Sequence, residues 1–572
     1  MIKAPREIVN ERLAWGALIG VAALLQIFLS LNTPYPYVIE SGDNGSILYI
    51  IARWLDGEAF AQDALLGIEG STSFYQAALM WPNYLMGLMG LQLGLFYVIA
   101  CFPMALAQMA GFYLLGKRLF DHRAIALALG LITLPVVYTL SGDLWGMYNS
   151  PLMRTGFAAS LPWLLLLMIA ARPRPYLLML AAGLASYLHL PSGPPVALAL
   201  LAVCFLRAGP SEGWMRASLH HILAGLFYLL IMSPYAVLYA QGFAAGDAKA
   251  LDIYTGSPYA NVSVALDQLM SLRGPNRMAI LVGRVEGLAW VGALTKPLFA
   301  AIFLLGSLAL CALSILAIGP ARARIKAALD IRRNWVWVAG FFVLTIGIGV
   351  GLSALDQAIA AANGRGPVQL DLIRATRFIV PASYLGLFFA LALLAPRRAA
   401  VVGITVITAL VWLTAYPSTS HGLYRLTKGQ SIQDRALADF GAFVLELKTR
   451  DDLDVLTPVL RYDYQSSALR YIGYLPLRFN RKDNNFITYS GTASAADHRA
   501  LMDRIDAIRK ARRRSDEQAP LIDSFLRDLG GRDMVIDRRI VLEEAEALLR
   551  ANHGFSLVFE RGDFALMRRV AP

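Results

Sequence analysis

The 572-residue sequence contains few charged residues and only three cysteines. Asp, Glu, Lys and Arg make up 16% of the chain, whereas soluble proteins average about 25%, and hydrophobic residues make up 57%. One globular core could not hide this much apolar surface, so the composition predicts a membrane protein. The cysteines, Cys101, Cys204 and Cys311, lie inside apolar runs without metal-like spacing, so we expect them to be packing residues.

The charges that are present are unevenly distributed along the chain. Long uncharged runs fill the first part, whereas acidic and basic residues crowd into the last part, which predicts a transmembrane domain at 1–416 and a soluble domain at 417–572. The formal net charge is +12, but many Lys and Arg residues occupy short loops between apolar runs, where they indicate topology. We therefore expect no nucleic-acid partner.

The apolar runs predict a polytopic α-helical membrane protein with about eleven transmembrane helices, at about 20 residues per span. The run at 124–140 is a clear candidate. The run at 74–91 contains Pro82 and Asn83, so it either spans or lies at the interface. The run at 176–205 is too long for one span and is broken by prolines and Gly193, which predicts a hairpin of two short helices.

Basic clusters between the runs predict the orientation in the membrane. Placing Arg207 and Arg397 with their neighbours in the cytoplasm puts the N-terminus inside and residues after 416 in the periplasm of a bacterial inner membrane. The Lys117–Arg118 loop conflicts with this arrangement if 74–91 spans. In the soluble domain, runs at 455–460 and 534–536 resemble strands and segments at 494–514 and 542–552 resemble amphipathic helices, which predicts an α/β fold.

The first external loop, 32–73, carries the strongest candidate for chemistry. It bends at Pro34 and Pro36 and then presents Glu40 and Asp43 next to the membrane surface, where an aspartate can meet a lipid headgroup. The other interpretation is that Asp43 belongs to a turn and caps a helix beginning near Gly45.

Short motifs around this loop resemble the GT-C class of integral membrane glycosyltransferases. They are Arg53-Trp54-Leu55, the run from Phe60 to Leu65, Ser73-Phe74-Tyr75 and the run from Leu114 to Phe120. The resemblance implies a polyprenyl-phosphate-linked sugar as donor, a lipid, glycan or protein as acceptor, Asp43 as catalytic base and Asp63 as the second acid of the first loop. We expect Glu40, like Asp63, to be an acidic support of the site. Some members of the class use a divalent cation, Mg or Mn, and others do not. The Trp-Trp-Asp-Tyr-Gly motif of oligosaccharyltransferases is absent from the sequence.

The chemistry of an inverting transfer needs one carboxylate as base and cations that stabilise the departing phosphate. Arg374 and Arg377 stand three residues apart at the external mouth of a predicted span, and we expect them to converge with Asp43 on one cavity. Alternatively, they snorkel to water or pair with Asp371. Arg273 and Arg277 form a second candidate pair.

Two further polar residues lie at predicted external positions. His189, at the break of the 176–205 run, could bond the phosphate, although a structural hydrogen bond is the other interpretation. Asp143 lies on an external turn beside Trp145 and Tyr148, which could stack on a sugar, although we favour their interpretation as interface-belt aromatics.

Two other functions are compatible with the same residues. A transporter or flippase for lipid-linked sugars could also hold a phosphate with arginines, although only one interrupted helix is evident. A non-catalytic subunit of an envelope-polysaccharide assembly would have no need of Asp43.

Overall fold

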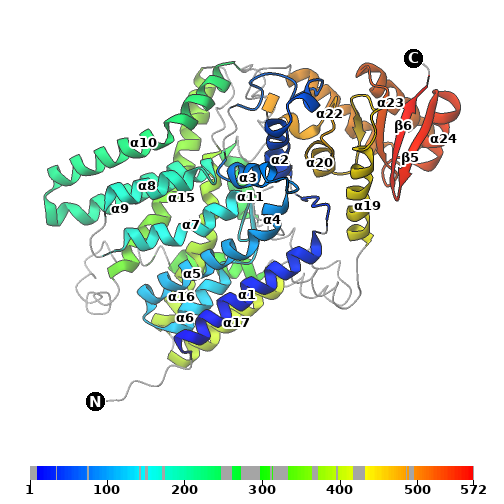
Figure 1. The fold of residues 1–572 in the computed structure, drawn as a ribbon. Helices are drawn as coiled ribbons and strands as arrows, with labels where there is room; N and C mark the ends of the chain where they lie inside the picture. Colours follow the sequence, from blue (N-terminus) through cyan, green and yellow to red (C-terminus); the bar gives the residue numbers. More distant parts are fainter. Residues whose placement is uncertain are drawn as a thin grey trace. The chain divides into compact units, whose positions relative to one another are not determined.

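A computed structural model describes residues 9–33, 35–40, 42–73, 77–140, 143–147, 153–170, 174–245, 261–271, 297–309, 312, 333–363, 371–394, 397–415, 432–484, 486–487 and 495–570. The chain forms two compact units (Figure 1). Unit 1 comprises Met1–Phe28, Ala100–Ser233 and Asp252–Tyr424. Unit 2 comprises Leu29–Ile99, Pro234–Leu251 and Arg425–Pro572.

The helices of unit 1 are apolar and in several cases long enough to cross a membrane. They are α1 (Glu11–Asn32), α5 (Cys101–Phe120), α6 (Arg123–Ile132), α7 (Met153–Met168), α8 (Pro175–Ser186), α9 (Gly193–Glu212), α10 (Trp214–Ala245), α11 (Val262–Met270), α15 (Arg333–Ala362), α16 (Ile379–Leu394) and α17 (Arg397–Ala415), the ends of α1 and α10 extending into unit 2. Within the described ranges, six helical segments have the length and hydropathy of a membrane span, and five apolar helices are shorter. The helical membrane protein predicted from composition is confirmed, with six such segments instead of about eleven.

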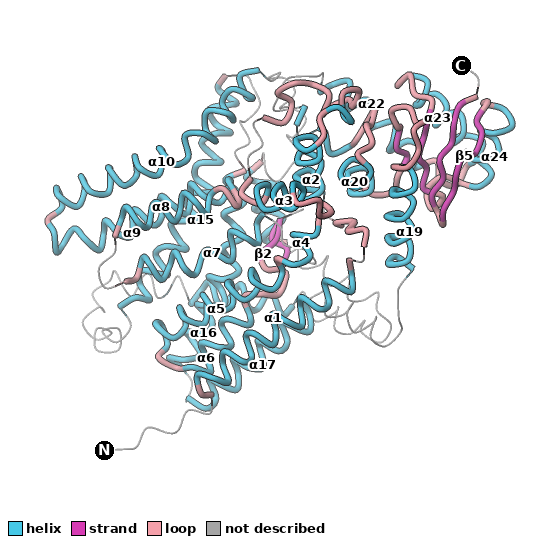
Figure 2. The backbone as a smooth tube through the Cα atoms, in the orientation of Figure 1, coloured by secondary structure: helices cyan, strands magenta, loops and turns pink. Residues whose placement is uncertain are grey.

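Two of the predicted segments have clear outcomes in unit 1. The 176–205 run is a helical hairpin, as predicted, in which the 3₁₀ turn η2 (Leu190–Ser192) joins α8 to α9. The span predicted at 124–140 is wrong. Helix α6 ends at Ile132, and β1 (Val137–Leu140) pairs with antiparallel β2 (Asp143–Trp145), seen in Figure 2. Pro135 cannot continue a helix, and the β-branched residues after it favour extended backbone.

Several helix ends meet at one end of unit 1. Lys117 on α5 forms an ion pair with Glu11 at the start of α1, with 2.9 Å between Nζ and Oε2, and Arg123 at the start of α6 lies 3.4 Å from the same oxygen. Trp335 near the start of α15 donates its Nε1 hydrogen to the Leu119 carbonyl at 3.0 Å. Lys117 therefore lies at the same end as the N-terminus of α1.

The segment at 74–91 lies in unit 2 and, in its described part, contains only α3 (Met80–Leu88). Nine residues rise about 14 Å, roughly half the thickness of a bilayer core, so α3 does not span. The conflict between the Lys117–Arg118 loop and the other basic clusters consequently disappears.

Unit 2 combines the first loop with the C-terminal region. Its helices are α2 (Gly42–Leu55), η1 (Glu58–Phe60), α3, α4 (Leu95–Ile99), α19 (Ile432–Leu447), α20 (Asp463–Gly473), η6 (Arg481–Asp483), α22 (Ala495–Lys510), α23 (Ser515–Asp528) and α24 (Glu543–Asn552). Helix α2 packs closely on α20, because a Cβ added at Gly45 would lie 2.8 Å from the Ser467 Cβ. The predicted boundaries assign loop 32–73 to the membrane domain, whereas the structure groups it with the C-terminal region.

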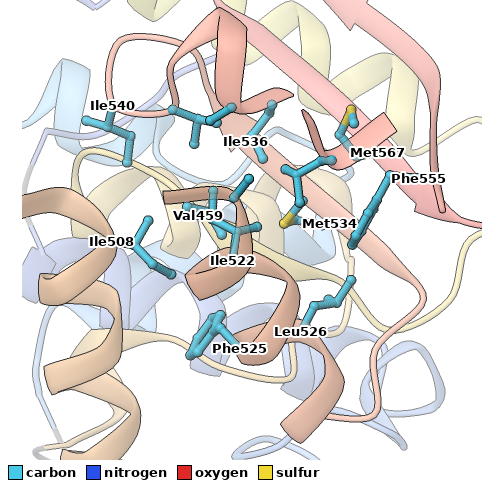
Figure 3. Packing of buried hydrophobic residues seen from close by; sticks show 14 of the residues in the cluster. Val459, Ile508, Ile522, Phe525, Leu526, Met534, Ile536, Ile540, Phe555 and Met567 are labelled. Carbon is cyan, nitrogen blue, oxygen red and sulfur yellow. The ribbon is translucent and has the colours of Figure 1, made fainter. Parts of the chain in front are cut away.

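The C-terminal region contains a four-stranded sheet in the order β3-β4-β6-β5. Strand β3 (Thr457–Val459) is parallel to β4 (Asp533–Asp537), and β4, β6 (Phe564–Arg569) and β5 (Phe555–Arg561) are antiparallel. Side chains from the sheet, including Met534 and Ile536, are buried against Ile508 and Phe525 of the helices (Figure 3). The strands predicted in 455–460 and 534–536 and the helices predicted in 494–514 and 542–552 are confirmed.

A buried histidine makes the stability of unit 2 dependent on pH. His498 on α22 is 7% exposed and stacks on the Phe479 ring, with 4.9 Å between ring centroids. Burial lowers the pKa of His498 to about 4. An unfolded chain binds this proton below about pH 6.5 and the folded chain does not, so stability is lost as the pH falls from 6.5 towards 4.

We expect this histidine to reduce the stability of unit 2 by about 2 kcal/mol between pH 7 and pH 5. Amide hydrogen exchange of β4 in the detergent-solubilised full chain, corrected for intrinsic exchange rates, measures the loss. His498→Gln has no titrating ring and should lose less stability over the same interval. Equal pH dependence of parent and variant would contradict the assignment.

Candidate functional site

The predicted site residues fall into two groups, one in each unit. Arg374, Arg377 and His189 belong to unit 1. Asp43, Glu40 and Asp63 belong to unit 2. Convergence of the two groups on one cavity stays a prediction, and Arg273 and Arg277 lie outside the described residues.

The first group surrounds η5 (Leu372–Phe378), the 3₁₀ segment that leads into α16. Arg377 is fully buried there. Its Nη2 donates to Ser192 Oγ at 2.5 Å and lies 3.4 Å from His189 Nδ1. The His189 Nδ1 and Ser192 Oγ atoms are themselves 2.9 Å apart. The break between α8 and α9 thus brings both His189 and Ser192 into contact with Arg377.

Two carboxylates balance the charge of the two arginines. A single oxygen of Asp371, Oδ2, accepts from Arg374 Nε at 3.0 Å and from Arg374 Nη2 at 2.8 Å. The Asp143 Oδ1 lies 3.6 Å from Arg374 Nη1 and 3.9 Å from Arg377 Nη1. We call the following six residues the arginine cluster: Asp143, His189, Ser192, Asp371, Arg374 and Arg377. Its charges compensate one another inside unit 1, as burial of ions requires.

The two arginines differ in accessibility. The Arg374 side chain is 17% exposed and that of Arg377 is 1% exposed. Neither arginine snorkels, and the predicted alternative of pairing with Asp371 is observed for Arg374. Since a ligand can reach only an accessible donor, Arg374 is the better candidate for contacting a phosphate, and Arg377 is better placed to support it.

Two aromatic rings lie against the buried guanidinium of Arg377. Its central carbon lies 5.4 Å from the Phe378 ring centroid and 5.9 Å from that of Phe157. Trp145 packs on Phe378 and donates its Nε1 hydrogen to the Thr133 carbonyl at 2.8 Å. The interpretation of Trp145 as an interface-belt aromatic is therefore wrong, because this side chain is fully buried.

The arginine cluster lies away from the Lys117 end of unit 1. Helix α15 begins beside Leu119, through Trp335, and packs on η5 about halfway along its length, where a Cβ added at Gly349 would lie 2.7 Å from the Leu372 carbonyl oxygen. Helix α6 likewise begins beside Glu11 and leads to the β1–β2 hairpin that carries Asp143. These two helices therefore separate the basic residues around Lys117 from the arginine cluster.

Asp43 lies in the first turn of α2, in unit 2. Lys482 Nζ donates to Asp43 Oδ1 at 2.9 Å, and the two side chains are 26% and 34% exposed. A carboxylate is favoured near a helix N-terminus. Because α2 begins at Gly42, Asp43 is not a cap preceding Gly45, and it presents a partly accessible, ion-paired carboxylate.

Glu40 and the residues before it are fastened to α20. The Tyr471 hydroxyl accepts from the Ile39 amide at 2.8 Å and donates to the Tyr37 carbonyl at 3.2 Å. Glu40 faces Tyr464, since burial, together with the charge of Glu40, raises the pKa of Tyr464 well above its ordinary value. The acidic end of the first loop is thus held by one helix of the C-terminal region.

Asp63 belongs to a fully buried ion cluster, which we call the Arg470 cluster: Asp63, Arg470 and Asp483. Arg470 donates from Nε and Nη2 to Asp63, both at 2.8 Å, and from Nη1 and Nη2 to Asp483 at 2.7 and 2.8 Å. The Asp63 carboxylate also accepts from the amides of Leu65, Leu66 and Leu477. These bonds give Asp63 a structural role, joining the first loop to the C-terminal region.

Burial and pairing act in opposite directions on the Arg470 cluster. Burial raises the pKa of Asp483 to about 6, against the attraction of Arg470. The two carboxylates raise the pKa of Arg470 further above its ordinary value, overcoming its own desolvation. At neutral pH Asp483 and Arg470 are therefore both charged.

The sequence indicates Asp43, the two arginines, His189 and the pairing of Arg374 with Asp371, but it does not indicate Asp143, Ser192 and Lys482 as partners. Asp143 is central to the arginine cluster, although its sequence context indicated only a turn. Ser192 stands in the proline-rich break after His189, and small polar residues at such a break are a signal that could have identified it. No local sequence pattern indicates Lys482 as a partner of Asp43.

A divalent cation would need several carboxylate or imidazole ligands. In the described part of the chain, no three His, Cys, Asp or Glu side chains are grouped to hold a metal ion. We therefore assign no residues to a Mg or Mn ion.

A comparison with known protein families gave no family that matches this sequence, and a comparison with curated proteins gave no significant match. The membrane character therefore rests on the apolar helices. Any functional assignment rests on the chemistry of Asp43 and of the arginine cluster.

Proposed function

We propose that this chain is a membrane glycosyltransferase that transfers a sugar, with inversion, from a polyprenyl-phosphate donor to a lipid, glycan or protein acceptor. The observation that supports this proposal most is the position of Asp43. It is a partly accessible carboxylate in the loop after the first apolar helix, fixed in place by an ion pair. This is the position that the resemblance to the GT-C class requires for a catalytic base.

The reaction follows from the chemistry of the residues. Asp43 takes the proton of an acceptor hydroxyl while that oxygen attacks the anomeric carbon. The bond from the anomeric carbon to the phosphate oxygen breaks, and its electron pair leaves with the polyprenyl phosphate. Arg374 donates hydrogen bonds to the phosphate as its negative charge increases. Asp371 keeps the Arg374 side chain oriented, as does Asp143, which also lies beside Arg377.

The proposal also includes an orientation in a bacterial inner membrane. The Lys117 end of unit 1 gathers basic residues, including Arg123, and the positive-inside rule favours a cytoplasmic position for it. The opposite end, with the arginine cluster, then faces the periplasm, as does the C-terminal region.

Arg374→Met tests the donor-phosphate role. A lost charge-assisted hydrogen bond to a phosphate corresponds to about 1.5–3 kcal/mol, so we expect kcat/KM for the donor to fall about tenfold to 150-fold. Arg374→Lys keeps the charge but loses the planar fork and should recover only part of the loss. The assay uses the purified full chain in lipid nanodiscs and measures sugar transferred from polyprenyl-phosphate donors.

Arg118→Met is the matched control, because Arg118 is an exposed arginine at the opposite end of unit 1. It should transfer sugar at the parental rate. An active parent whose Arg374→Met variant keeps its donor kcat/KM would remove Arg374 from the donor site. A parent that transfers no sugar from any polyprenyl-phosphate donor, but moves lipid-linked sugars across a bilayer, would favour the transporter.

A further inference from the structure

The C-terminal region places a lysine directly on the candidate base of the first loop. Lys482 stands 439 positions after Asp43 in the sequence, yet its Nζ lies 2.9 Å from Asp43 Oδ1. We propose that Lys482 is a positioning residue that holds and orients the Asp43 carboxylate, so that the C-terminal region forms part of the active site. This inference rests on the proposed function.

The segment that carries Lys482 is held from both sides. Arg481 bonds Asp506 on α22, with 2.8 Å between Nη1 and Oδ1. Asp483 is fully buried and accepts two hydrogen bonds from Arg470. Between them, the Lys482 amide donates to the Asn480 side chain at 3.1 Å, which fixes the start of η6. The backbone at Lys482 therefore has little freedom.

The helix that carries Asp43 is fixed to the same anchor. Tyr49, two turns after Asp43 on α2, donates its hydroxyl hydrogen to Asp483 Oδ1 at 3.4 Å. The Arg470 guanidinium carbon lies 4.9 Å from the centroid of the Tyr49 ring. Asp43 and Lys482 are thus both connected to the Arg470 cluster. Both partners of the ion pair are therefore held by elements that pack against the Arg470 cluster.

A lysine at this distance affects a base in two ways. It keeps the carboxylate ionised, since an opposite charge within about 4–6 Å favours the charged form. It also occupies one carboxylate oxygen and thereby directs the other one. Among the described residues, Lys482 from η6 pairs with Asp43, and the hydroxyl of Tyr97 from α4 interacts with Asp43 electrostatically. Lys482 is therefore the cation that a substitution should remove.

Lys482→Met keeps the length of the side chain and removes its charge. We expect kcat for sugar transfer to fall about tenfold to 100-fold with a smaller change in donor KM. The acid limb of the pH profile should move up by about one pH unit or more, because Asp43 loses its stabilising cation. Lys482→Arg should restore most of the rate and the parental acid limb, which a loss of packing would not predict.

Lys510→Met is the matched control. Lys510 is an exposed lysine of the same region for which the described structure shows no ion-pair partner, so kcat and the pH profile should match those of the parent. Amide hydrogen exchange of β4 should be equal in parent, Lys482→Met and Lys510→Met, which shows that the unit stays folded. An active parent with unchanged kcat and pH profile in Lys482→Met would overturn the proposal.

Carbodiimide labelling of the Asp43 carboxylate, read by mass spectrometry, gives a result that does not need activity. Labelling should increase in Lys482→Met and stay at the parental level in Lys510→Met. Unchanged labelling in Lys482→Met would overturn the pairing. An inactive parent whose Asp43 labelling responds to Lys482→Met would uphold the pairing and overturn the glycosyltransferase assignment instead.

Discussion

Arg470→Met is expected to destabilise unit 2 by about 3–5 kcal/mol, because it removes one partner of a buried ion cluster and leaves Asp63 and Asp483 buried without a countercharge. The loss should appear as faster amide exchange in both α2 and α20, since Arg470 joins the first loop to the C-terminal region. The full chain in detergent is the sample, with exchange read by mass spectrometry.

The effect of Arg470→Met should depend on pH in a specific direction. Without the guanidinium, burial raises the pKa of Asp483 further above its unfolded value. The destabilisation is then present above the folded pKa of Asp483 and is relieved as the pH falls through it, because the protonated acid carries no charge. The deficit relative to the parent should therefore be smaller at pH 5 than at pH 7.5.

Two controls separate loss of charge balance from loss of packing. Arg478 pairs with Asp454 at a partly exposed site, with 3.1 Å between Nη2 and Oδ2, so Arg478→Met should cost less than about 1 kcal/mol. Combining Arg470→Met with Asp63→Asn and Asp483→Asn removes every charge of the cluster and should be less destabilising than Arg470→Met. If the triple variant were less stable than Arg470→Met, charge balance would not explain the destabilisation.

Local patterns predicted much of the fold. The break of the 176–205 run was predicted from its prolines, and the sequence 534–536 was recognisable as a buried strand. The span predicted at 124–140 is wrong because hydropathy does not distinguish one long helix from a short helix followed by an apolar hairpin. Pro135 is the local signal that favours the short helix.

Long-range pairing was beyond the reach of one sequence. The bonds of Arg470 to Asp63 join positions 407 residues apart, and nothing in either local context predicts the partner. Asp143 likewise meets Arg374 only because α6 and α15 bring the hairpin and η5 together at one end of unit 1. The resemblance to a family indicates candidate residues, whereas the packing of the chain determines the partners that hold them.

Asp43→Asn is the substitution with the largest expected effect on activity. The variant keeps nearly the same shape and an oxygen that can accept from Lys482, but it cannot take the proton of an acceptor hydroxyl. We expect sugar transfer to fall by roughly a hundredfold to ten-thousandfold, the usual range for removal of a general base. Donor binding should change little, because the phosphate is assigned to Arg374.

Stability should not change with activity in this variant. Asp43 lies in the first turn of α2 and is partly exposed, so loss of its charge there corresponds to only about 0.3–1 kcal/mol. Amide exchange of α2 and α20 should therefore be close to parental. Asp56→Asn is the matched control, since Asp56 is an exposed aspartate at the end of α2 whose carboxylate accepts from the Ala59 amide at 3.2 Å.

The comparison of the two variants decides the role of Asp43. A folded Asp43→Asn variant without transfer, beside an active Asp56→Asn variant, would identify a carboxylate needed for chemistry at this one position. Parental transfer by Asp43→Asn would leave the ion pair with Lys482 as its only role. Glu40 would then be the next base to test, because it stands three residues earlier on the same loop and is half-buried against α20, whereas the oxygens of Asp63 are engaged by Arg470 and three amides.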